Sequence, residues 1–531
     1  MTEILMTFSI SDKKILLLII FATLARLIIA GSLELGNDEV YYWTYALHLQ
    51  WNYFDHPPIV GWLIRLTTAN LLLHTELFVR FGAIISSAMG TFLIYRTGTV
   101  ARNKQTGWYA ALLYTASPYC SIIAGTFILP DSPQMVFWLW SIFLLIRIVK
   151  LPLISSSSPK LWCWFGVSAG LCVMCKVHGV FLWFAVVLYA LFYNRSWFND
   201  KSIYLSVVIS LLIVSPVIAW NIQNHFISYA YHSNRVTLSG AALNLDGFAK
   251  ELAGSFFYNN PLNFVLIWSS IITFWKGKVT TDKSQIRLLL CCGLPLIGVL
   301  LIVSLFKDTL PHWSGPGYSC LIILAAIRLS SVFGNKISRV HTYLKYSLAF
   351  TAVLSIAGII VINCFPGTLS SKKSGLNTGE GDFTLDMYGW KETGIKIDSV
   401  FKSDSIKKTM PGNAPIIINN WFPAAHIDFY IASITSHETY ALGNLFNLHQ
   451  YFWYNQYKKP LRNGDAAYFI MPSNLYKPED IEQLKQNFLS ISPPDVICIY
   501  RQRVLCKRIY IFRLKGYRSN ARNIRDLNHD L

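Results

Sequence analysis

The sequence predicts a polytopic α-helical membrane protein with about eleven transmembrane helices and an extracytoplasmic α/β domain at its C-terminal end. First, 53% of its 531 residues are hydrophobic and only 14% are charged, whereas roughly a quarter of an ordinary soluble domain is charged. Second, long apolar runs recur as far as residue 364. Third, the composition after residue 365 becomes a mixture of polar and apolar residues. An ordinary soluble multidomain enzyme is therefore excluded.

The apolar runs are long enough to serve as membrane spans. Crossing a hydrocarbon core of ~30 Å takes about 20 residues, or somewhat fewer where aromatic and basic residues anchor the ends. We count eleven such runs, at residues 14–33, 79–96, 107–125, 133–149, 161–175, 177–193, 203–220, 262–275, 288–306, 313–330 and 346–364. The first resembles a signal peptide, but Arg26 interrupts it and no clean cleavage site follows. We expect it to remain as a helix.

The basic residues predict the orientation of these spans. The net charge of +18 would suggest a nucleic-acid partner in a soluble protein. Here, with the N-terminus inside, the inner loops hold eighteen Lys and Arg residues, and the outer loops before the last helix hold six. Lys and Arg stay on the cytoplasmic side during insertion. We expect a cytoplasmic N-terminus, membrane lipids as surroundings and no nucleic-acid partner.

Two outer regions are too long to be simple connections. In the first outer loop, residues 34–78, apolar side chains recur at helical spacing at Val40, Trp43 and Leu47, and again over 59–66. Tyrosines and tryptophans accompany both stretches, so we expect two helices lying in the membrane interface.

The second outer region is the tail, residues 366–531, which follows a membrane domain at residues 1–365. Its expected elements are strands at Ile416 to Ile418, Ala467 to Met471, Val496 to Tyr500 and Arg508 to Phe512, with a polar helix near Pro478 to Phe488. They indicate a soluble α/β domain of ordinary size. Cys498 and Cys506 face each other across the expected terminal hairpin, either as a disulfide or as two thiols.

Acidic residues are scarce before the tail, which makes their positions informative. Asp38 and Glu39 follow the first span, Asp55 separates the two interfacial helices, and Asp131 precedes a later span. All are expected on the outer side. Asp before a helix is most often an N-cap. Several such groups at one interface, beside aromatic residues such as Tyr41 and Tyr42, also indicate a functional site.

Cationic residues are expected on the same side. They are His56, Arg65, Lys176, Arg235, Lys307 and His312. Lys176 lies in a tight turn between two spans, where it is either a snorkelling lysine or an anion ligand at headgroup depth. The nearby Cys172 and Cys175 lie inside an apolar helix and are interpreted as packing residues.

Carboxylates and cations on one membrane face suit transfer of a group from a phosphate-linked lipid. Cations stabilise the charge that develops on the leaving phosphate, and a carboxylate takes the proton of an incoming hydroxyl. Motifs for acyl transfer, metalloprotease chemistry or nucleotide hydrolysis are not found in the sequence. The chemistry requires no cofactor or metal, and a divalent cation is compatible with it.

Several motifs resemble glycosyltransferase family 39, which includes protein O-mannosyltransferases and bacterial lipid A aminoarabinose transferases. The specific part is the first outer loop, where Asp38-Glu-Val-Tyr-Tyr-Trp is followed by Tyr53-Phe-Asp-His-Pro-Pro-Ile-Val-Gly-Trp-Leu-Ile-Arg65. Segments that agree later in the chain are Leu129-Pro-Asp-Ser-Pro133, Cys175-Lys-Val-His178, Trp220-Asn-Ile-Gln-Asn, His312-Trp-Ser-Gly-Pro, Asp386-Met-Tyr-Gly-Trp390 and His449-Gln-Tyr-Phe-Trp453.

This resemblance implies a GT-C fold in the bacterial inner membrane with a periplasmic C-terminal domain. It also implies transfer of one sugar from a polyprenyl-phosphate donor to a lipid, glycan or protein acceptor, by inverting displacement. Asp38 matches the family's catalytic carboxylate, which is expected to deprotonate the acceptor, with Glu39 and Asp55 as further catalytic candidates. His56, Lys176, Arg235 and His312 are expected to bind the donor phosphate, and Tyr41, Tyr42, Arg65 and Asp131 to line the cavity.

One position departs from the family pattern. The pair Asp55-His56 corresponds to Glu-Lys in the aminoarabinose transferases, where the lysine contacts the lipid phosphate. With histidine, phosphate binding at this point either depends on pH or relies on Lys176 and Arg235 instead.

Two other function classes compete with this hypothesis. A multi-pass transporter or lipid flippase predicts ionisable residues midway along several helices and pseudo-repeated halves, but we find only Arg26 within a span and no repeat. A structural scaffold would not need acidic residues concentrated at one interface.

Overall fold

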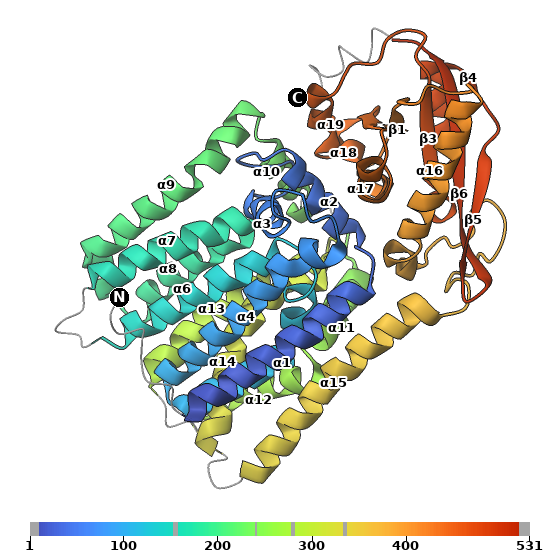
Figure 1. Ribbon diagram of the computed structural model, residues 1–531. Helices are drawn as coiled ribbons and strands as arrows, with labels where there is room; N and C mark the ends of the chain where they lie inside the picture. The colour runs from blue at the N-terminus through green and yellow to red at the C-terminus, as the bar shows by residue number, and fades with distance from the viewer. Residues whose placement is uncertain (1–9, 152–157, 239–241, 278–281, 333–336, 520–531) are drawn as a thin grey trace. The chain divides into compact units, whose positions relative to one another are not determined.

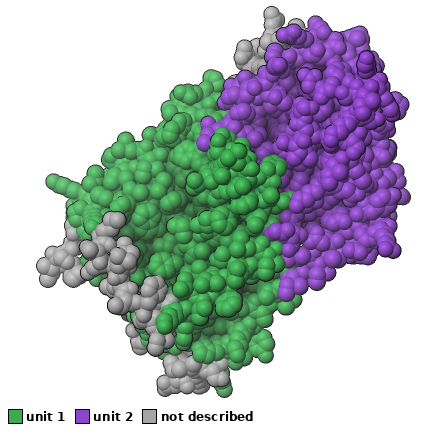
Figure 2. All heavy atoms as spheres, viewed as in Figure 1, with its two compact units in different colours: residues 1–30, 50–52, 56–355 green, residues 31–49, 53–55, 356–531 purple. Residues whose placement is uncertain are grey.

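The computed structural model describes residues 10–151, 158–238, 242–277, 282–332 and 337–519. The chain divides into two compact units, which Figure 2 colours separately. Unit 1 comprises residues 1–30, 50–52 and 56–355, and unit 2 comprises residues 31–49, 53–55 and 356–531. Unit 2 therefore contains the start of the first outer loop as well as the C-terminal segment. The boundary expected near residue 365 stays a prediction.

Unit 1 is built from α-helices (Figure 1). Its helices are α1 (Ile10–Ser32), α3 (Ile59–Thr67), α4 (Glu76–Ala101), α5 (Lys104–Thr115), α6 (Asp131–Val149), α7 (Pro159–Cys175), α8 (Val180–Phe192), α9 (Lys201–Gln223), α10 (Ile227–Val236), α11 (Leu245–Tyr258), α12 (Pro261–Trp275), α13 (Lys283–Ser304), α14 (Gly315–Val332) and α15 (Ile337–Cys364), the first and last of which continue into unit 2. Shorter helical segments are η1 (Tyr119–Ile123), η3 (Val177–Gly179), η4 (Arg195–Asn199) and η5 (Pro311–Ser314).

Each apolar run of the sequence falls on helical structure. In the described part of the chain, six helices (α1, α4, α6, α9, α13 and α15) are long and apolar enough to cross a membrane, and three shorter apolar helices cover residues 159–175, 177–192 and 261–275. The run at 107–125 is interrupted, because α5 ends at Thr115 and a π-helical segment follows Pro118. Proline disfavours the helical conformation of the residue before it. The number of membrane crossings stays a prediction.

Large apolar side chains remain exposed along the long helices. Examples are Phe21 on α1, Leu212 on α9 and Val353 on α15, which are 68%, 67% and 65% exposed. Such continuous apolar faces are costly in water and are the surface that lipid covers in a membrane protein. The core of unit 1 lies between the helices and includes the buried rings of Trp138 and Trp162. The chain is a multi-pass membrane protein.

Unit 2 is an α/β structure. Its helices are α2 (Asn37–Leu47), α16 (Trp390–Ile406), α17 (Trp421–Tyr430), α18 (Leu445–Leu448), α19 (Tyr451–Tyr454) and α20 (Pro478–Asn487), with short 3-10 segments η6 (Phe383–Met387), η7 (Ala432–Ile434), η8 (Asn455–Tyr457) and η9 (Ser473–Leu475). Its strands are β1 (Ile416–Ile418), β2 (Thr439–Ala441), β3 (Ala467–Pro472), β4 (Phe488–Ile491), β5 (Asp495–Arg501) and β6 (Val504–Tyr517).

The strands form one mixed sheet in the order β2-β1-β3-β6-β4, and β5 also pairs with β6. β1 runs parallel to β2 and β3, whereas β6 runs antiparallel to β3, β4 and β5. Alternate side chains of β3 enter two different clusters, Tyr468 and Ile470 in one and Phe469 and Met471 in the other. Both sheet faces are therefore covered, as expected for parallel strands. The four predicted strands and the predicted helix after residue 478 are confirmed.

The terminal hairpin does not hold a disulfide. Cys498 is paired across the β5–β6 ladder with Arg508, and the Cys506 thiol donates to the carbonyl oxygen of Ile499. Both cysteines are free thiols. The disulfide alternative is wrong, because the register of the ladder places the two cysteines out of alignment.

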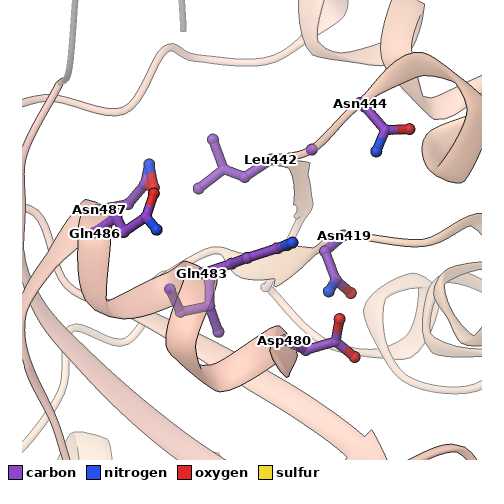
Figure 3. A pocket seen from close by; sticks show the side chains of 9 residues that line it. Asn419, Leu442, Asn444, Asp480, Gln483, Gln486 and Asn487 are labelled. Carbon is purple, nitrogen blue, oxygen red and sulfur yellow. The ribbon is translucent and has the colours of Figure 1, made fainter. Parts of the chain in front are cut away.

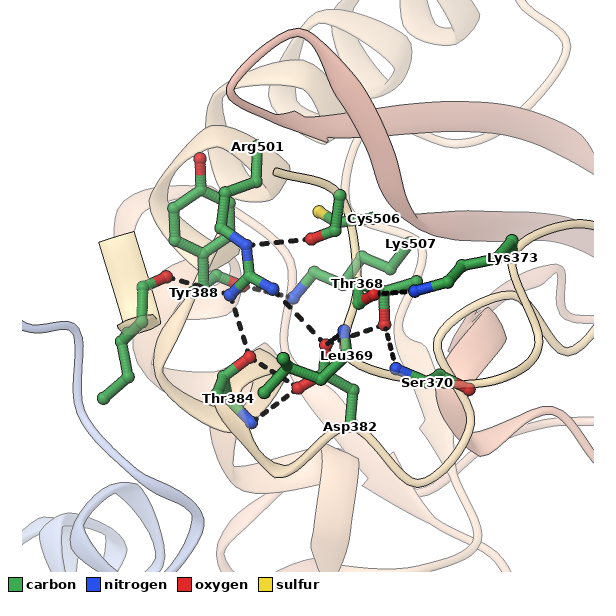
Figure 4. A network of polar contacts seen from close by, with 12 residues as sticks. Thr368, Leu369, Ser370, Lys373, Asp382, Thr384, Tyr388, Arg501, Cys506 and Lys507 are labelled. Carbon is green, nitrogen blue, oxygen red and sulfur yellow. Dashed lines mark hydrogen bonds and ion pairs between the residues drawn. The ribbon is translucent and has the colours of Figure 1, made fainter. Parts of the chain in front are cut away.

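A buried arginine joins this hairpin to the segment that follows α15. Arg501 is fully buried and donates to the carbonyl oxygens of Ile362 and Gly367, both at 2.9 Å, and to the Thr384 hydroxyl at 2.8 Å. Its guanidinium also lies 3.4 Å from the Asp382 carboxylate (Figure 4). This network fixes the start of the C-terminal domain on the sheet.

Candidate functional site

Lys176 and Asp131 form a buried ion pair in unit 1. α7 ends just before Lys176 and α6 begins at Asp131, and the Lys176 ammonium donates to the Asp131 carboxylate at 2.7 Å. The Tyr119 hydroxyl donates to the other carboxylate oxygen at 2.9 Å. Both charged side chains are almost fully buried, and buried charges need such partners. Lys176 is therefore not a snorkelling residue, and Asp131 makes a tertiary ion pair in the first turn of its helix.

Arg235 lies in the last turn of α10 and is held by aromatic rings. Its guanidinium carbon lies 4.8 Å from the centre of the Trp313 ring and 5.6 Å from that of Tyr231. An arginine over an aromatic face keeps its full charge, and the contact fixes its position.

Histidines surround these two cations. His56 and His232 have ring centres 5.8 Å apart, and the ring of His312 lies 6.3 Å from that of Tyr258. Burial lowers the pKa of His56 well below its ordinary value, and the positive charges of His232, Lys176, His178 and Arg235 lower it further. Burial also lowers the pKa of His312 to about 4, with Asp131 opposing the shift and Lys176 and Arg235 adding to it.

Lys176 and Arg235 thus each lie within electrostatic range of both His56 and His312 inside unit 1. We refer to His56, Lys176, Arg235 and His312 as the basic cluster. At neutral pH its two histidines are uncharged, so each presents one N–H donor and one acceptor nitrogen. Permanent positive charge comes from Lys176, which is paired with Asp131, and from Arg235.

The predicted catalytic carboxylates lie in unit 2, where they differ in environment. Asp38 occupies the first turn of α2 and is exposed to solvent. Glu39, only 2% exposed, accepts a hydrogen bond at 2.9 Å from the backbone N–H of Gly36, the residue before the helix. Glu39 therefore stabilises the start of α2, as acidic side chains do at helix N-termini.

Asp55 is held by tyrosines of α2. It is 9% exposed and accepts hydrogen bonds from the hydroxyls of Tyr41, at 3.2 Å, and Tyr45. The backbone N–H of Gln450 donates in turn to the Tyr41 hydroxyl at 3.2 Å. Tyr42 is buried and packs its ring against Tyr41 and Tyr45. Asp55 thus links the loop after α2 to the helix itself.

The residue before Asp38 is clamped between two groups of the C-terminal segment. The Asn37 amide donates to the Asp386 carboxylate at 2.9 Å, and its carbonyl oxygen lies 3.1 Å from His426 Nε2. His426 stacks on Trp390, with ring centres 4.2 Å apart and an interplanar angle of 5°. We refer to Asn37, Asp386 and His426 as the Asn37 clamp.

Asp386 in the Asn37 clamp has a perturbed acidity. Burial raises its pKa to about 7, and the negative charge of Asp38 adds to this shift while Lys507 opposes it. Two carboxylates within electrostatic range share their protons unequally. The Asp386 segment, which the sequence singles out as a motif, therefore tunes the charge around Asp38.

Arg65, predicted to line the cavity, lies near the end of α3 in unit 1, where its guanidinium bonds the Asn70 side chain. Among the described residues, no group of three or more His, Cys, Asp or Glu side chains is arranged to hold a metal ion.

Unit 2 contains a cavity of about 320 Å³ beside α20. Figure 3 shows Gln483, Asn419 and Asn444 around it, together with the Asp480 carboxylate. Its lining is dominated by side-chain amides and includes no aromatic ring.

Sequence reasoning missed Tyr119 and His232 in unit 1 and His426 in unit 2. Tyr119 lies in an apolar run and gave no signal as the partner of Asp131. His232 precedes Arg235 by three residues, a helical spacing that places the two on one face. His426 lies within an expected soluble domain, far along the chain from Asn37.

Comparison with known proteins relates the chain to glycosyltransferases. A family model described as dolichyl-phosphate-mannose-protein mannosyltransferase matches residues 55–220. A protein of Proteus mirabilis (strain HI4320), named undecaprenyl phosphate-alpha-4-amino-4-deoxy-L-arabinose arabinosyl transferase 2, is 23% identical over 61% of this chain and 59% of its own length. The lipid A galacturonosyltransferase RgtD of Rhizobium johnstonii (strain DSM 114642 / LMG 32736 / 3841) is 20% identical over 66% of this chain and 70% of its own length. The matched part spans less than two thirds of the Proteus relative.

Solved structures share the fold. ArnT from Cupriavidus metallidurans in the apo state superposes with a TM-score of 0.63, at 13% identity over 95% of this chain and 98% of ArnT. The structure of the same protein bound to undecaprenyl phosphate gives a TM-score of 0.61, at 14% identity over 94% of this chain and 98% of ArnT. The chain thus has the GT-C fold and is related in sequence to the family-39-like glycosyltransferases.

Proposed function

We propose that this chain is a membrane glycosyltransferase that moves one sugar from a polyprenyl-phosphate donor to a lipid A, polysaccharide or protein acceptor at the periplasmic face of the inner membrane. The observation that carries the proposal is the basic cluster, in which Lys176 and Arg235 are fixed among uncharged histidines. A fold does not need a lysine, an arginine and two histidines gathered at one place for its stability, because burying a charged group is costly. The relatives named for undecaprenyl phosphate-linked donors support the donor class.

The proposed reaction is an inverting displacement. Asp38 removes the proton of the acceptor hydroxyl, and the acceptor oxygen attacks the anomeric carbon of the sugar. The bond from that carbon to the phosphate oxygen breaks, and polyprenyl phosphate leaves with the bonding electron pair. Lys176 and Arg235 stabilise the negative charge on the leaving phosphate, while His56 and His312 donate hydrogen bonds to it.

The uncharged state of His56 matters because the aminoarabinose transferases have a lysine at the corresponding position. A lysine at this position would be positively charged at pH 7, whereas the lowered pKa of His56 keeps it neutral. We infer that phosphate charge is balanced by Lys176 and Arg235, and that His56 contributes a hydrogen bond.

The test uses a strain that lacks the gene, complemented with wild type or variants, and mass spectrometry of its lipid A, polysaccharide and glycoprotein. We expect one sugar to be lost in the deletion strain and restored by wild type. Removing a general base lowers rates by about 10²–10⁴-fold, so Asp38→Asn should not restore it. The matched control is Asp246→Asn, which changes another exposed aspartate at the second position of a helix.

The basic cluster is tested in the same strain. We expect Arg235→Gln to fail to restore the sugar and Arg287→Gln to succeed, since Arg287 also stacks on a ring, 4.8 Å from Tyr193, outside the cluster. A deletion strain with unchanged lipid A, polysaccharide and glycoprotein would refute the proposed activity. Full restoration by Asp38→Asn would instead refute only the base assignment.

A further inference from the structure

A second cavity of unit 2 differs in chemistry from the amide-lined one. It has a volume of about 290 Å³ and lies among the end of α2, the α17–β2 connection and η8. Its size is at the lower end of the range for small-molecule sites, roughly 300–1,000 Å³. It belongs to neither the basic cluster nor the Asn37 clamp.

Aromatic rings form one side of this cavity. They are those of Trp43 and His48 from α2 and its end, and of Tyr454 and Tyr457. His48 stacks on Tyr457, with ring centres 4.0 Å apart and an interplanar angle of 13°. Trp43 and Tyr454 are buried, whereas Tyr457 is 51% exposed. The walls are therefore rigid, and one ring stands at the opening.

Polar groups of both signs lie on the other side. The Lys458 ammonium donates to the Thr439 hydroxyl at 2.7 Å, and the same hydroxyl donates to the Asp428 carboxylate at 2.8 Å. Tyr451 also donates to Asp428, at 2.6 Å. Glu438 adds an exposed carboxylate to the lining. An ammonium has three donors, so Lys458 can bond a ligand while it keeps Thr439.

Lys458 has a perturbed environment for a lysine near the surface. Burial lowers its pKa, and the carboxylates of Asp428 and Glu438 oppose that shift. A titratable group perturbed in this way and placed in a cleft is typical of binding sites. Its hydrogen bond to Thr439 holds the Lys458 ammonium at the cavity wall. The side chain of a solvent-exposed lysine, by contrast, moves freely.

The aromatic rings, carboxylates and ammonium that line this cavity suit a sugar as the ligand. A sugar ring presents an apolar C–H face, which packs on an aromatic ring, and a rim of hydroxyls, which bond to charged and polar side chains. The Asp, Glu and Lys side chains of the lining are two carboxylates and one ammonium, and this excess of acidic groups disfavours ligands that carry phosphate or carboxylate.

We propose that this cavity binds one neutral or amino-substituted sugar residue, stacked against Tyr457 and bonded through its hydroxyls to Lys458 and Asp428. Binding here does not depend on the transfer reaction. The sugar is either an isolated ring or a residue within a longer glycan, and both present the same chemistry to the cavity.

The test measures binding to the full-length protein in detergent micelles by saturation-transfer NMR. The probes are methyl glucoside, the methyl glycoside of glucosamine, methyl glucuronide and a delipidated lipopolysaccharide core oligosaccharide. We expect the first two to bind with a Kd of ~1 mM and the glucuronide to bind at least about fivefold more weakly, because a like charge repels it. Tighter binding of the oligosaccharide than of the methyl glycosides would identify a residue within a glycan as the ligand, and equal binding an isolated ring.

Variants assign the binding to this cavity. We expect Lys458→Met and Tyr457→Ala each to weaken methyl glucoside binding at least about fivefold, the loss of one hydrogen bond or one packed face. Their controls are Lys459→Met, the adjacent exposed lysine, and Tyr500→Ala, an exposed tyrosine of β5 that is 49% exposed. Thermal unfolding of each variant checks that it folds.

Gln483→Ala, in the amide-lined cavity, distinguishes the two cavities of unit 2. No methyl glycoside binding, preference for the glucuronide, or binding lost in Gln483→Ala and kept in Lys458→Met and Tyr457→Ala would each overturn the proposal. None of these outcomes bears on the activity proposed for Asp38, so the two proposals fail separately.

Discussion

Arg501 shows how one side chain organises the segment around the end of α15. It is fully buried, and its guanidinium is shared among two backbone carbonyls, a hydroxyl and the Asp382 carboxylate. Asp382 also accepts from the Thr368 hydroxyl and the Leu369 N–H, both at 2.7 Å. Removing one partner of such a pair leaves an uncompensated buried charge.

We expect Arg501→Met to lower the free energy of unfolding by about 3–5 kcal/mol, because Asp382 loses its counter-charge. Arg503→Met, at an exposed turn position of the same hairpin, should change it by less than about 0.5 kcal/mol. Thermal or denaturant unfolding of the purified protein measures both. Adding Asp382→Asn to Arg501→Met should recover part of the lost stability. Equal stability of Arg501→Met and Arg503→Met would contradict the role given to the Arg501–Asp382 pair.

Asp386 predicts a pH dependence of stability. Its folded-state pKa is about 7, above the ordinary value of 3.8, so the folded protein keeps a proton that the unfolded chain has released. This contribution to stability is complete below pH 3.8 and is lost as the pH rises through about 7.

We expect Asp386→Asn to be more stable than wild type at pH 8, by about 2 kcal/mol once partial exposure is taken into account. The difference should vanish at pH 4, because both side chains are then neutral. Melting temperatures of the two proteins between pH 4 and pH 8 test this. Parallel curves across that range would mean that Asp386 is already ionised in the fold.

At the scale of elements, α2 carries the proposed base and depends on groups far along the chain. Asn37, in its first turn, is bonded to Asp386 and His426, and the Glu34 carboxylate just before it accepts from the Trp390 N–H at 2.7 Å. A helix of this length is marginal by itself, and most of its stability comes from tertiary packing.

We expect Asn37→Ala to speed amide hydrogen exchange over residues 38–45 by about tenfold, since two hydrogen bonds that hold the helix start are lost. The control is Asn377→Ala, which removes an amide bonded to Tyr476 elsewhere in the same unit. Mass-resolved exchange of the intact protein gives the readout. Unchanged exchange in Asn37→Ala would show that the Asn37 clamp does not support α2.

Sequence patterns predicted the long apolar elements and four of the strands, and missed the two short strands β2 and β4. The run that became α13 is uniformly apolar, the run that became α1 is apolar apart from Arg26, and strand β3 is buried along its whole length, so hydrophobic pattern alone located them. β2 is three residues long and was missed, because its pairing with β1 depends on a crossover through α17. The break after α5 also escaped, since a local proline ended an otherwise apolar run.

At the scale of the molecule, the orientation in the membrane rests on loop charge and is open to a direct test. We expect Ser374→Cys, an exposed position in the tail, to react with a membrane-impermeant maleimide in spheroplasts. Ser196→Cys, exposed in an expected inner loop, should react only after permeabilisation. Both are made in a Cys364→Ser background, because Cys364 is an exposed thiol. The reverse labelling pattern would show that the tail lies inside the cytoplasm and that the predicted orientation is wrong.

The candidate site was predicted in part. The sequence located His56, Lys176, Arg235 and His312, because scarce charged residues in an apolar chain stand out. It did not predict that Lys176 pairs with Asp131, because an ion pair across two helices depends on how they pack. The neutral state of the histidines likewise depends on burial, which no local motif encodes.

The composition of unit 2 sets an order of events during biosynthesis. Residues 31–49 emerge from the ribosome early, but apart from residues 53–55 the rest of unit 2 begins at residue 356. At roughly 5–20 residues per second, the roughly 300 intervening residues take on the order of tens of seconds to synthesise. Until then the tyrosine-rich segment with Asp38 has no completed unit to join, so it stays unassembled while the helices of unit 1 are made. Chaperones and quality-control proteases on whichever side of the membrane holds the segment would meet it in this state, and the protein would acquire its proposed base only at the last step of its own maturation.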